Sequence, residues 1–323
     1  MQLGSRRRWV MMAAPAIAGV LGLASTAAPI HTAGAADADK TAVAERCAMR
    51  LSVSLLGKTP TDTTLKDANP QSEVDTMLQS PDFIERFSRF VNSQYNKEPG
   101  TTPLDDATYY MSKYVLQNNK PWSDMFMGQY KLGTDANGNV TVADDPNGLG
   151  YFRNNQWLVR YAGNEPAGIK LVTANRIMWN IIGLTLVAST NAPGADVSAT
   201  GRQAQPCAGC HYDPWFALDK VASILTVRQA DAKGNVTFAP QTSASVQILG
   251  GQTIHDDKEL VTALVSSENY PFNVCRTAFK FLYGRAENKC DAPLFDRCVD
   301  TFKAQKTIQS AIGVVAKDPG FCQ

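Results

Sequence analysis

Apolar residues recur with helical spacing along most of the chain. One predicted helix carries Val74, Met77 and Leu78 on a single face. The next begins with Ser80 as N-cap and Pro81 at the first position, and its apolar face is formed by Phe83, Phe87, Phe90 and Val91. The same spacing occurs near residues 40–56, 104–117, 122–131, 167–189, 256–267, 272–283 and 294–316. The pattern predicts a mainly α-helical fold whose aromatic and Met side chains pack in a core.

Two related segments interrupt the helical pattern. Residues 135–141 and 231–237 both read Asp-Ala-x-Gly-Asn-Val-Thr, which predicts two short β-hairpins. The first also resembles the start of a calcium loop, but Val140 stands where such a loop needs Gly. We expect a domain boundary in this region, with a helical domain at 37–149 and a second, motif-bearing helical domain at 150–323.

The first residues are typical of an export signal. Arg6–Arg8 precede an apolar run from Trp9 to Leu23, and small residues follow as far as Ala35. The run is too short, and too interrupted by Pro15, to span a bilayer comfortably. We therefore expect residues 1–36 to be a signal peptide and the mature protein to be periplasmic or otherwise exported, with no transmembrane segment.

The composition of the chain excludes several classes of binding and catalytic site. Lys and Arg number 31 against 30 Asp and Glu in 323 residues, so the basic excess that nucleic-acid binding needs is missing. The chain has three histidines, which nearly excludes sites built from several imidazoles. Serine-hydrolase, zinc-protease and nucleotide-binding motifs are absent from the sequence.

One motif carries specific chemistry. Cys207-Ala-Gly-Cys210-His211 is the attachment pattern of c-type haem. Two thiols three residues apart can reach both vinyl groups of one haem, and His211 then offers its imidazole as the proximal iron ligand. A zinc half-site lacks the second C-x-x-C that would complete it, and a thioredoxin-like pair lacks its βαβ setting. We expect one covalently bound haem c and no second haem on this chain.

The sixth iron ligand is left open by the sequence. No Met follows Met178, so the downstream Met of small c-type cytochromes is not available. His255 is the downstream imidazole and a possible distal ligand, although it also fits an exposed turn before a helix capped by Asp256. Upstream Met125, Met127 and Met178 are further candidates, and a five-coordinate iron is the remaining alternative.

Five other cysteines occur, four of them in the last 50 residues. In an oxidising compartment they would form at most two disulfides and leave one thiol. The expected pairs are Cys275–Cys290 and Cys298–Cys322, and buried free thiols are the alternative.

Short segments along the chain resemble the planctomycete-type cytochrome-domain proteins, which are also common among myxobacteria. The resemblance rests on residues 50–57 and 74–81, Asn119–Trp122 with Gln129-Tyr130, 168–177, 213–218, Glu259-Leu260 and Leu282–Arg285. Only Tyr212 separates His211 from Asp213-Pro214, where the family has three residues. The family's haem-binding roles are therefore carried over to Cys207, Cys210 and His211 alone.

The leading hypothesis is an exported monohaem c-type cytochrome that transfers electrons between redox partner proteins after assembly by the cytochrome c maturation machinery. The alternative is a haem enzyme or a haem-bearing subunit of a periplasmic oxidoreductase complex, because about 290 mature residues exceed what covering one haem requires. A third possibility is an interaction protein in which haem is structural. Asp213 and Pro214 are expected to orient His211.

Overall fold

The computed structural model describes residues 33–96, 106–162, 170–186, 194, 196–213, 216–230, 236–239 and 245–323. Most of the expected signal peptide, residues 1–32, lies outside the described residues. Residues Thr41–Gln323 form one compact unit. Among the described helices, none combines the length and the apolar character that crossing a membrane requires.

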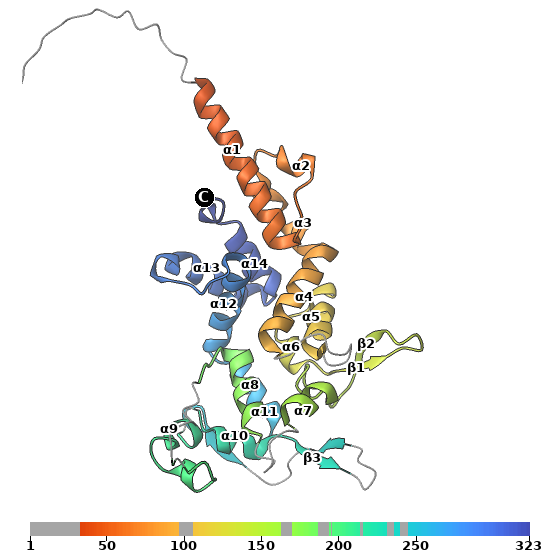
Figure 1. Ribbon diagram of the computed structural model, residues 1–323, viewed down its shortest axis with the longest axis vertical. Coiled ribbons are helices and arrows are strands. Elements are labelled where there is room, and N and C mark those ends of the chain that lie inside the picture. The colour runs from red at the N-terminus through yellow and green to blue at the C-terminus, as the bar shows by residue number, and fades with distance from the viewer. Residues whose placement is uncertain are drawn as a thin grey trace, which may run out of the picture. The chain divides into compact units, whose positions relative to one another are not determined.

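The fold is mainly helical, as the apolar spacing predicts (Figure 1). The helices are α1 (Ala33–Leu51), α2 (Asp62–Leu65), α3 (Val74–Gln79), α4 (Pro81–Tyr95), α5 (Ala107–Gln117), α6 (Asp124–Met127), α7 (Asn155–Ala162), α8 (Leu171–Ile182), α9 (Ala208–His211), α10 (Leu218–Ile224), α11 (Asp257–Val265), α12 (Asn269–Tyr283), α13 (Ala292–Gln305) and α14 (Ile308–Ala316). Shorter helical segments are η1 (Ser52–Leu56), η2 (Pro70–Glu73), η4 (Gly201–Gln203), η5 (Lys289–Asp291) and η6 (Pro319–Phe321).

In the described part of the chain, three antiparallel hairpins accompany the helices. Strands β1 (Tyr130–Thr134) and β2 (Val140–Asp144) form the first, and β3 (Val227–Ala230) and β4 (Val236–Ala239) form the second. Both were predicted, although the turn of the second lies outside the described residues. A third hairpin, β5 (Val246–Ile248) with β6 (Gln252–Ile254), was not predicted.

Local signals placed some helix boundaries well and missed others. Helix α4 begins as predicted, with the Ser80 hydroxyl accepting a hydrogen bond from Phe83 N and Pro81 at the first position. The expected stretch 294–316 is instead two helices, because Lys306 adopts a φ of 62° and ends α13 before Thr307 caps α14. The stretch 122–131 was also too long, since α6 ends at Met127 and strand β1 follows.

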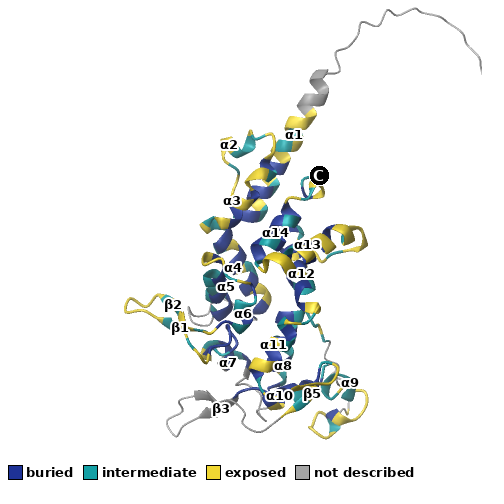
Figure 2. Cartoon of the chain, turned by 180° about the vertical axis from the view of Figure 1, so that it is seen from behind, coloured by how far each residue is buried: buried dark blue, intermediate teal, exposed yellow. Residues whose placement is uncertain are grey.

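The core is rich in aromatic side chains on α4 and α12. Phe83 and Phe87 of α4 are fully buried, and Phe281 of α12 packs edge-on against both rings. Buried residues also run along α14 (Figure 2). The expectation that these apolar positions form a core is confirmed.

Two disulfides are present, and neither has the expected partners. Cys47 in α1 pairs with Cys322 after η6, and Cys275 in α12 pairs with Cys298 in α13. Cys290 is free and exposed. The expected pairs were wrong because cysteine spacing does not show which segments pack together: α12 and α13 lie side by side, and the end of the chain returns to α1.

Contacts also cross the expected domain boundary near residue 150. Trp122 N donates a hydrogen bond of 2.8 Å to Lys306 O, and Lys317 Nζ in α14 lies 2.6 Å from Asp75 Oδ2 in α3. The division into 37–149 and 150–323 stays a prediction, and its two parts pack against each other.

Candidate functional site: a Cys-x-x-Cys-His turn

The motif forms a single helical turn. Helix α9 begins directly after Cys207, and His211 N donates a hydrogen bond of 3.1 Å to Cys207 O. Cys207 and Cys210 lie three residues apart on this turn, which places them on neighbouring positions of one helix face. Both thiols are outside the disulfides and partly exposed. The structure thus brings together the three residues that the sequence singled out.

A largely buried carboxylate holds the imidazole of His211. Its Nδ1 lies 2.7 Å from Oδ2 of Asp219 in the first turn of α10. The exposed fractions of the two side chains are 19% and 10%. Because an ionised carboxylate only accepts hydrogen bonds, we assign the proton to Nδ1, which leaves Nε2 as the ring nitrogen with a lone pair.

Arg202 in η4 fixes the carboxylate in turn. Its Nε lies 3.2 Å from Oδ1 and 3.1 Å from Oδ2 of Asp219, and its Nη2 lies 2.6 Å from Oδ1. The guanidinium also donates from Nη1 to Val197 O. The side chain of Arg202 is 7% exposed, so this ion pair is largely shielded from water. His211, Asp219 and Arg202 therefore form a connected series, which we call the His–Asp–Arg relay.

The position of Asp219 depends on the packing of α10. Ala217 precedes this helix with a φ of 42°, a left-handed conformation that turns the chain back beside α9. Leu218, Val221 and Ala222 are buried, and α10 packs against α8 and α9. The carboxylate is thus presented by a short helix with an anchored apolar face.

A buried lysine ties α10 to α8. Lys170, at the start of α8, donates from Nζ to Leu225 O at the end of α10, at 2.6 Å. Burial lowers the pKa of Lys170 to about 8, although the negative charge of Asp257 acts in the other direction and raises it. The bond satisfies a carbonyl that the end of α10 would otherwise leave without a helical partner.

The structure shows Asp219 beside His211, and the expected roles of Asp213 and Pro214 stay a prediction. Asp213 is exposed, and its backbone N donates to Ala208 O at 2.9 Å. Pro214 lies outside the described residues. Asp219 was missed because eight residues separate it from His211, and no spacing rule links them. The sequence feature that could have indicated Asp219 is the short apolar pattern of 218–225. It predicts a helix with Asp219 in its first turn.

The candidate distal ligand lies in an exposed turn. His255 joins β6 to α11, and its side chain is 62% exposed. Its Nδ1 lies 2.8 Å from Glu259 Oε2, which also accepts from the backbone N of His255. Asp256 caps α11 as predicted, accepting from Glu259 N at 2.7 Å. The polar contacts that the structure gives His255 are with Glu259, and its role as an iron ligand stays a prediction.

The candidate Met ligands are packed in the core. Met125 in α6 and Met178 in α8 are 0% and 1% exposed, and Met127 packs at the edge of the same core. This placement matches the core interpretation of these residues.

The donor set fits a covalently attached haem. Such attachment uses two free thiols on one turn and an imidazole whose Nε2 has, as here, no hydrogen-bond partner among the described residues. A Cβ built on Gly209, between the thiols, would meet nothing within 4 Å, so the turn has open space beside it. Comparison of the chain with protein-family models, with curated proteins and with solved structures gave no match.

Proposed function

We propose that this chain is a monohaem c-type cytochrome that transfers electrons. The observation that carries the proposal is the single turn on which two free thiols and an oriented imidazole stand together. Haem bound there would supply an iron that is oxidised and reduced by one electron. The protein's own residues would attach it, set its environment and expose it to redox partners.

Attachment would use the thiols of Cys207 and Cys210. Each S–H bond adds across one vinyl double bond, so the sulfur gains a thioether bond to carbon, the hydrogen goes to the neighbouring vinyl carbon, and nothing is lost. His211 would bind the iron through Nε2. The carboxylate of Asp219 keeps the proton on Nδ1 and fixes the plane of the ring, as partners of metal-binding histidines do.

Export is part of the proposal. The signal-like residues 1–36 support it, and so do the Cys47–Cys322 and Cys275–Cys298 disulfides, which persist in oxidising compartments. Maturation of c-type cytochromes would then take place where the disulfides form.

The test is production of the chain together with a cytochrome c maturation system, followed by optical spectra of the oxidised and reduced protein. The wild type should carry one haem that remains attached under denaturing conditions. The double variant Cys207→Ala/Cys210→Ala should lose covalent haem, whereas His211→Ala should keep it and lose the wild-type spectrum. Replacing the exposed Cys290 by Ala is the matched control and should change neither. Absence of covalent haem from the wild type would overturn the proposal.

A haem enzyme, or a haem-bearing subunit of an oxidoreductase complex, is the second candidate. It is favoured by the placement of the expected sixth ligands, since Met125 and Met178 are core residues and His255 is bonded to Glu259. An open iron position would bind carbon monoxide readily. A reduced spectrum that shifts with carbon monoxide would favour this candidate, and an unchanged one would favour electron transfer.

A further inference from the structure

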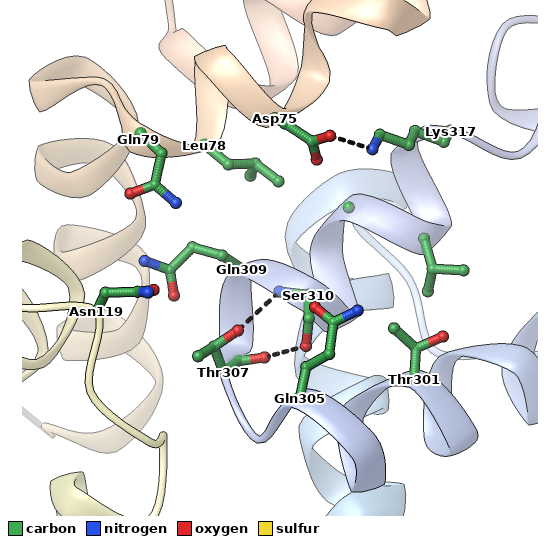
Figure 3. A pocket seen from close by; sticks show the side chains of 12 residues that line it. Asp75, Leu78, Gln79, Asn119, Thr301, Gln305, Thr307, Gln309, Ser310 and Lys317 are labelled. Atoms are coloured by element: carbon green, nitrogen blue, oxygen red, sulfur yellow. Dashed lines mark hydrogen bonds and ion pairs between the residues drawn. The ribbon is translucent and has the colours of Figure 1, made fainter.

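A second site lies away from the motif, between α3 and the last two helices. A pocket of about 560 Å³ is lined there by residues of α3, α13 and α14 and by Asn119 after α5 (Figure 3). This volume is within the range of pockets that hold small molecules. None of its residues belongs to the motif or to the His–Asp–Arg relay.

The pocket gathers neutral polar side chains from four segments. On one side of the pocket, the amide groups of Gln79, Asn119 and Gln309 point toward one another. Gln305 and Thr301 line the opposite side (Figure 3). For Gln79, Asn119, Thr301 and Gln305 the structure shows no side-chain hydrogen bond to another described residue. Five polar side chains from four segments therefore bring hydrogen-bonding groups to one space.

Gln309 is the most informative of them. The residue is 5% exposed, and within the described part of the chain its side chain makes one hydrogen bond, from Nε2 to Leu116 O at 3.4 Å. That distance is longer than the usual 2.7–3.2 Å of an N–H···O bond. A side-chain amide has two N–H donors and a carbonyl acceptor, so this one long bond leaves Gln309 with capacity to hydrogen-bond a ligand in the pocket.

Other polar groups of the pocket are already used. The hydroxyl of Thr307 accepts from Ser310 N as the cap of α14, and Ser310 Oγ donates to Thr307 O. Asp75 and Lys317 bond to each other at 2.6 Å (Figure 3). The charges of the lining thus balance, and the free groups are amides and one hydroxyl.

This lining selects a class of ligand. An amide offers a donor and an acceptor side by side, and a hydroxyl group both donates and accepts, so the two are complementary. Leu78, Val314 and the bare backbone of Gly313 offer apolar contacts for C–H groups. We propose that this pocket binds an uncharged, polyhydroxylated molecule of the saccharide class.

The experiment is titration of the full chain with three disaccharides, maltose, cellobiose and N,N′-diacetylchitobiose, followed by calorimetry and by saturation-transfer NMR. At least one should bind with a saturable isotherm. Gln305→Ala and Gln309→Leu should each weaken that binding about tenfold or more, because a site built to hydrogen-bond hydroxyl groups loses most when a partner is removed. Gln117→Ala, an exposed glutamine of α5 that does not line the pocket, should bind like the wild type.

Since Gln309 is buried, its variant is compared only if its thermal unfolding remains cooperative, and Gln79→Ala and Gln305→Ala, both at exposed positions, test the same pocket without that risk. No saturable binding of any of the three sugars would overturn the proposal. So would binding that all the pocket variants retain, or tighter binding of inorganic phosphate than of every sugar. The protein without haem should bind as well as the haem-loaded protein, which makes this test independent of the proposed function.

Discussion

At the scale of single residues, the Cys-x-x-Cys-His turn was readable from the sequence because its chemistry is local. Two thiols and an imidazole within five residues need only one turn of helix to come together. Asp219 was not readable, since its approach to His211 depends on a left-handed Ala217 and on the packing of α10. Arg202 was hidden for the same reason. The local motif therefore predicted that the two thiols and the imidazole lie together, and tertiary structure added the residues that hold the imidazole.

The His–Asp–Arg relay predicts that two substitutions shift the midpoint potential of the haem in opposite directions. A carboxylate on Nδ1–H increases the electron donation of the imidazole and stabilises oxidised iron. Asp219→Asn should therefore raise the midpoint potential of the haem-loaded protein. Arg202→Gln removes a positive charge that offsets the carboxylate and should lower it. We expect about a tenfold change in the reduction equilibrium, about 59 mV for one electron, in each case.

Redox titration followed by optical spectroscopy measures both changes, with Asp300→Asn, at an exposed position of α13, as control. A purely structural role would move both potentials in the same direction or broaden the spectra alike. Equal shifts of one sign would therefore contradict the assigned roles of Asp219 and Arg202. We expect both variants to keep covalently attached haem.

At the scale of elements, predictions succeeded where a boundary has its own chemical signal. Ser80 and Pro81 marked the start of α4, and the repeated Asp-Ala-x-Gly-Asn-Val-Thr segments marked two hairpins. The break between α13 and α14 was missed because Lys306 gives no sign of its left-handed conformation. Hairpin β5–β6 was missed because its strands have three residues each, too few to show an alternating pattern.

The packing of α4 against α5 predicts a pH dependence. Glu85 in α4 accepts from Tyr109 Oη at 2.6 Å and from Lys113 Nζ at 2.9 Å, both in α5. Burial by itself raises the pKa of Glu85, but the hydrogen bonds from Tyr109 and Lys113 outweigh it and lower the pKa from 4.5 to about 2. A carboxyl group with a depressed pKa stabilises the fold above its unfolded value, and that contribution is lost as the pH falls toward 2.

Replacing Glu85 by Gln should therefore lower the free energy of unfolding near neutral pH by about 1 kcal/mol or less, because the side chain is 35% exposed and water screens the ion pairs. Denaturant unfolding should show this difference shrinking between pH 4.5 and 2. Glu268→Gln, in an ion pair that is 80% exposed at the carboxylate, is the control with little effect at any pH. A difference that stayed constant down to pH 2 would refute the role of the Glu85 charge.

At the scale of the whole molecule, the sequence predicted that the chain is mainly helical but not how its distant parts meet. Cys47 and Cys322 are 275 residues apart, and their pairing depends on the end of the chain returning to α1. Arg50 strengthens the same junction, since its guanidinium lies 4.6 Å from the ring centroid of Phe321 and 5.5 Å from that of Tyr283. Cysteine spacing alone gives no basis for this long-range pair, which depends on how the fold packs.

The two disulfides should differ in their effect on stability. Cross-linking residues 275 apart removes more freedom from the unfolded chain than cross-linking residues 23 apart. In the chain-entropy account the long-range Cys47–Cys322 bond should stabilise the fold by about 2 kcal/mol more than Cys275–Cys298.

The comparison uses Cys47→Ala/Cys322→Ala and Cys275→Ala/Cys298→Ala, each retaining one disulfide, unfolded by denaturant with and without a thiol reductant. Within each variant, the free energy of unfolding is compared with and without the reductant. Since the sequence does not change in that comparison, the difference measures one disulfide and excludes any packing change that the substitutions cause. A larger loss on reducing Cys275–Cys298 would show that strain or residual structure, rather than chain entropy, governs how these bonds stabilise the protein.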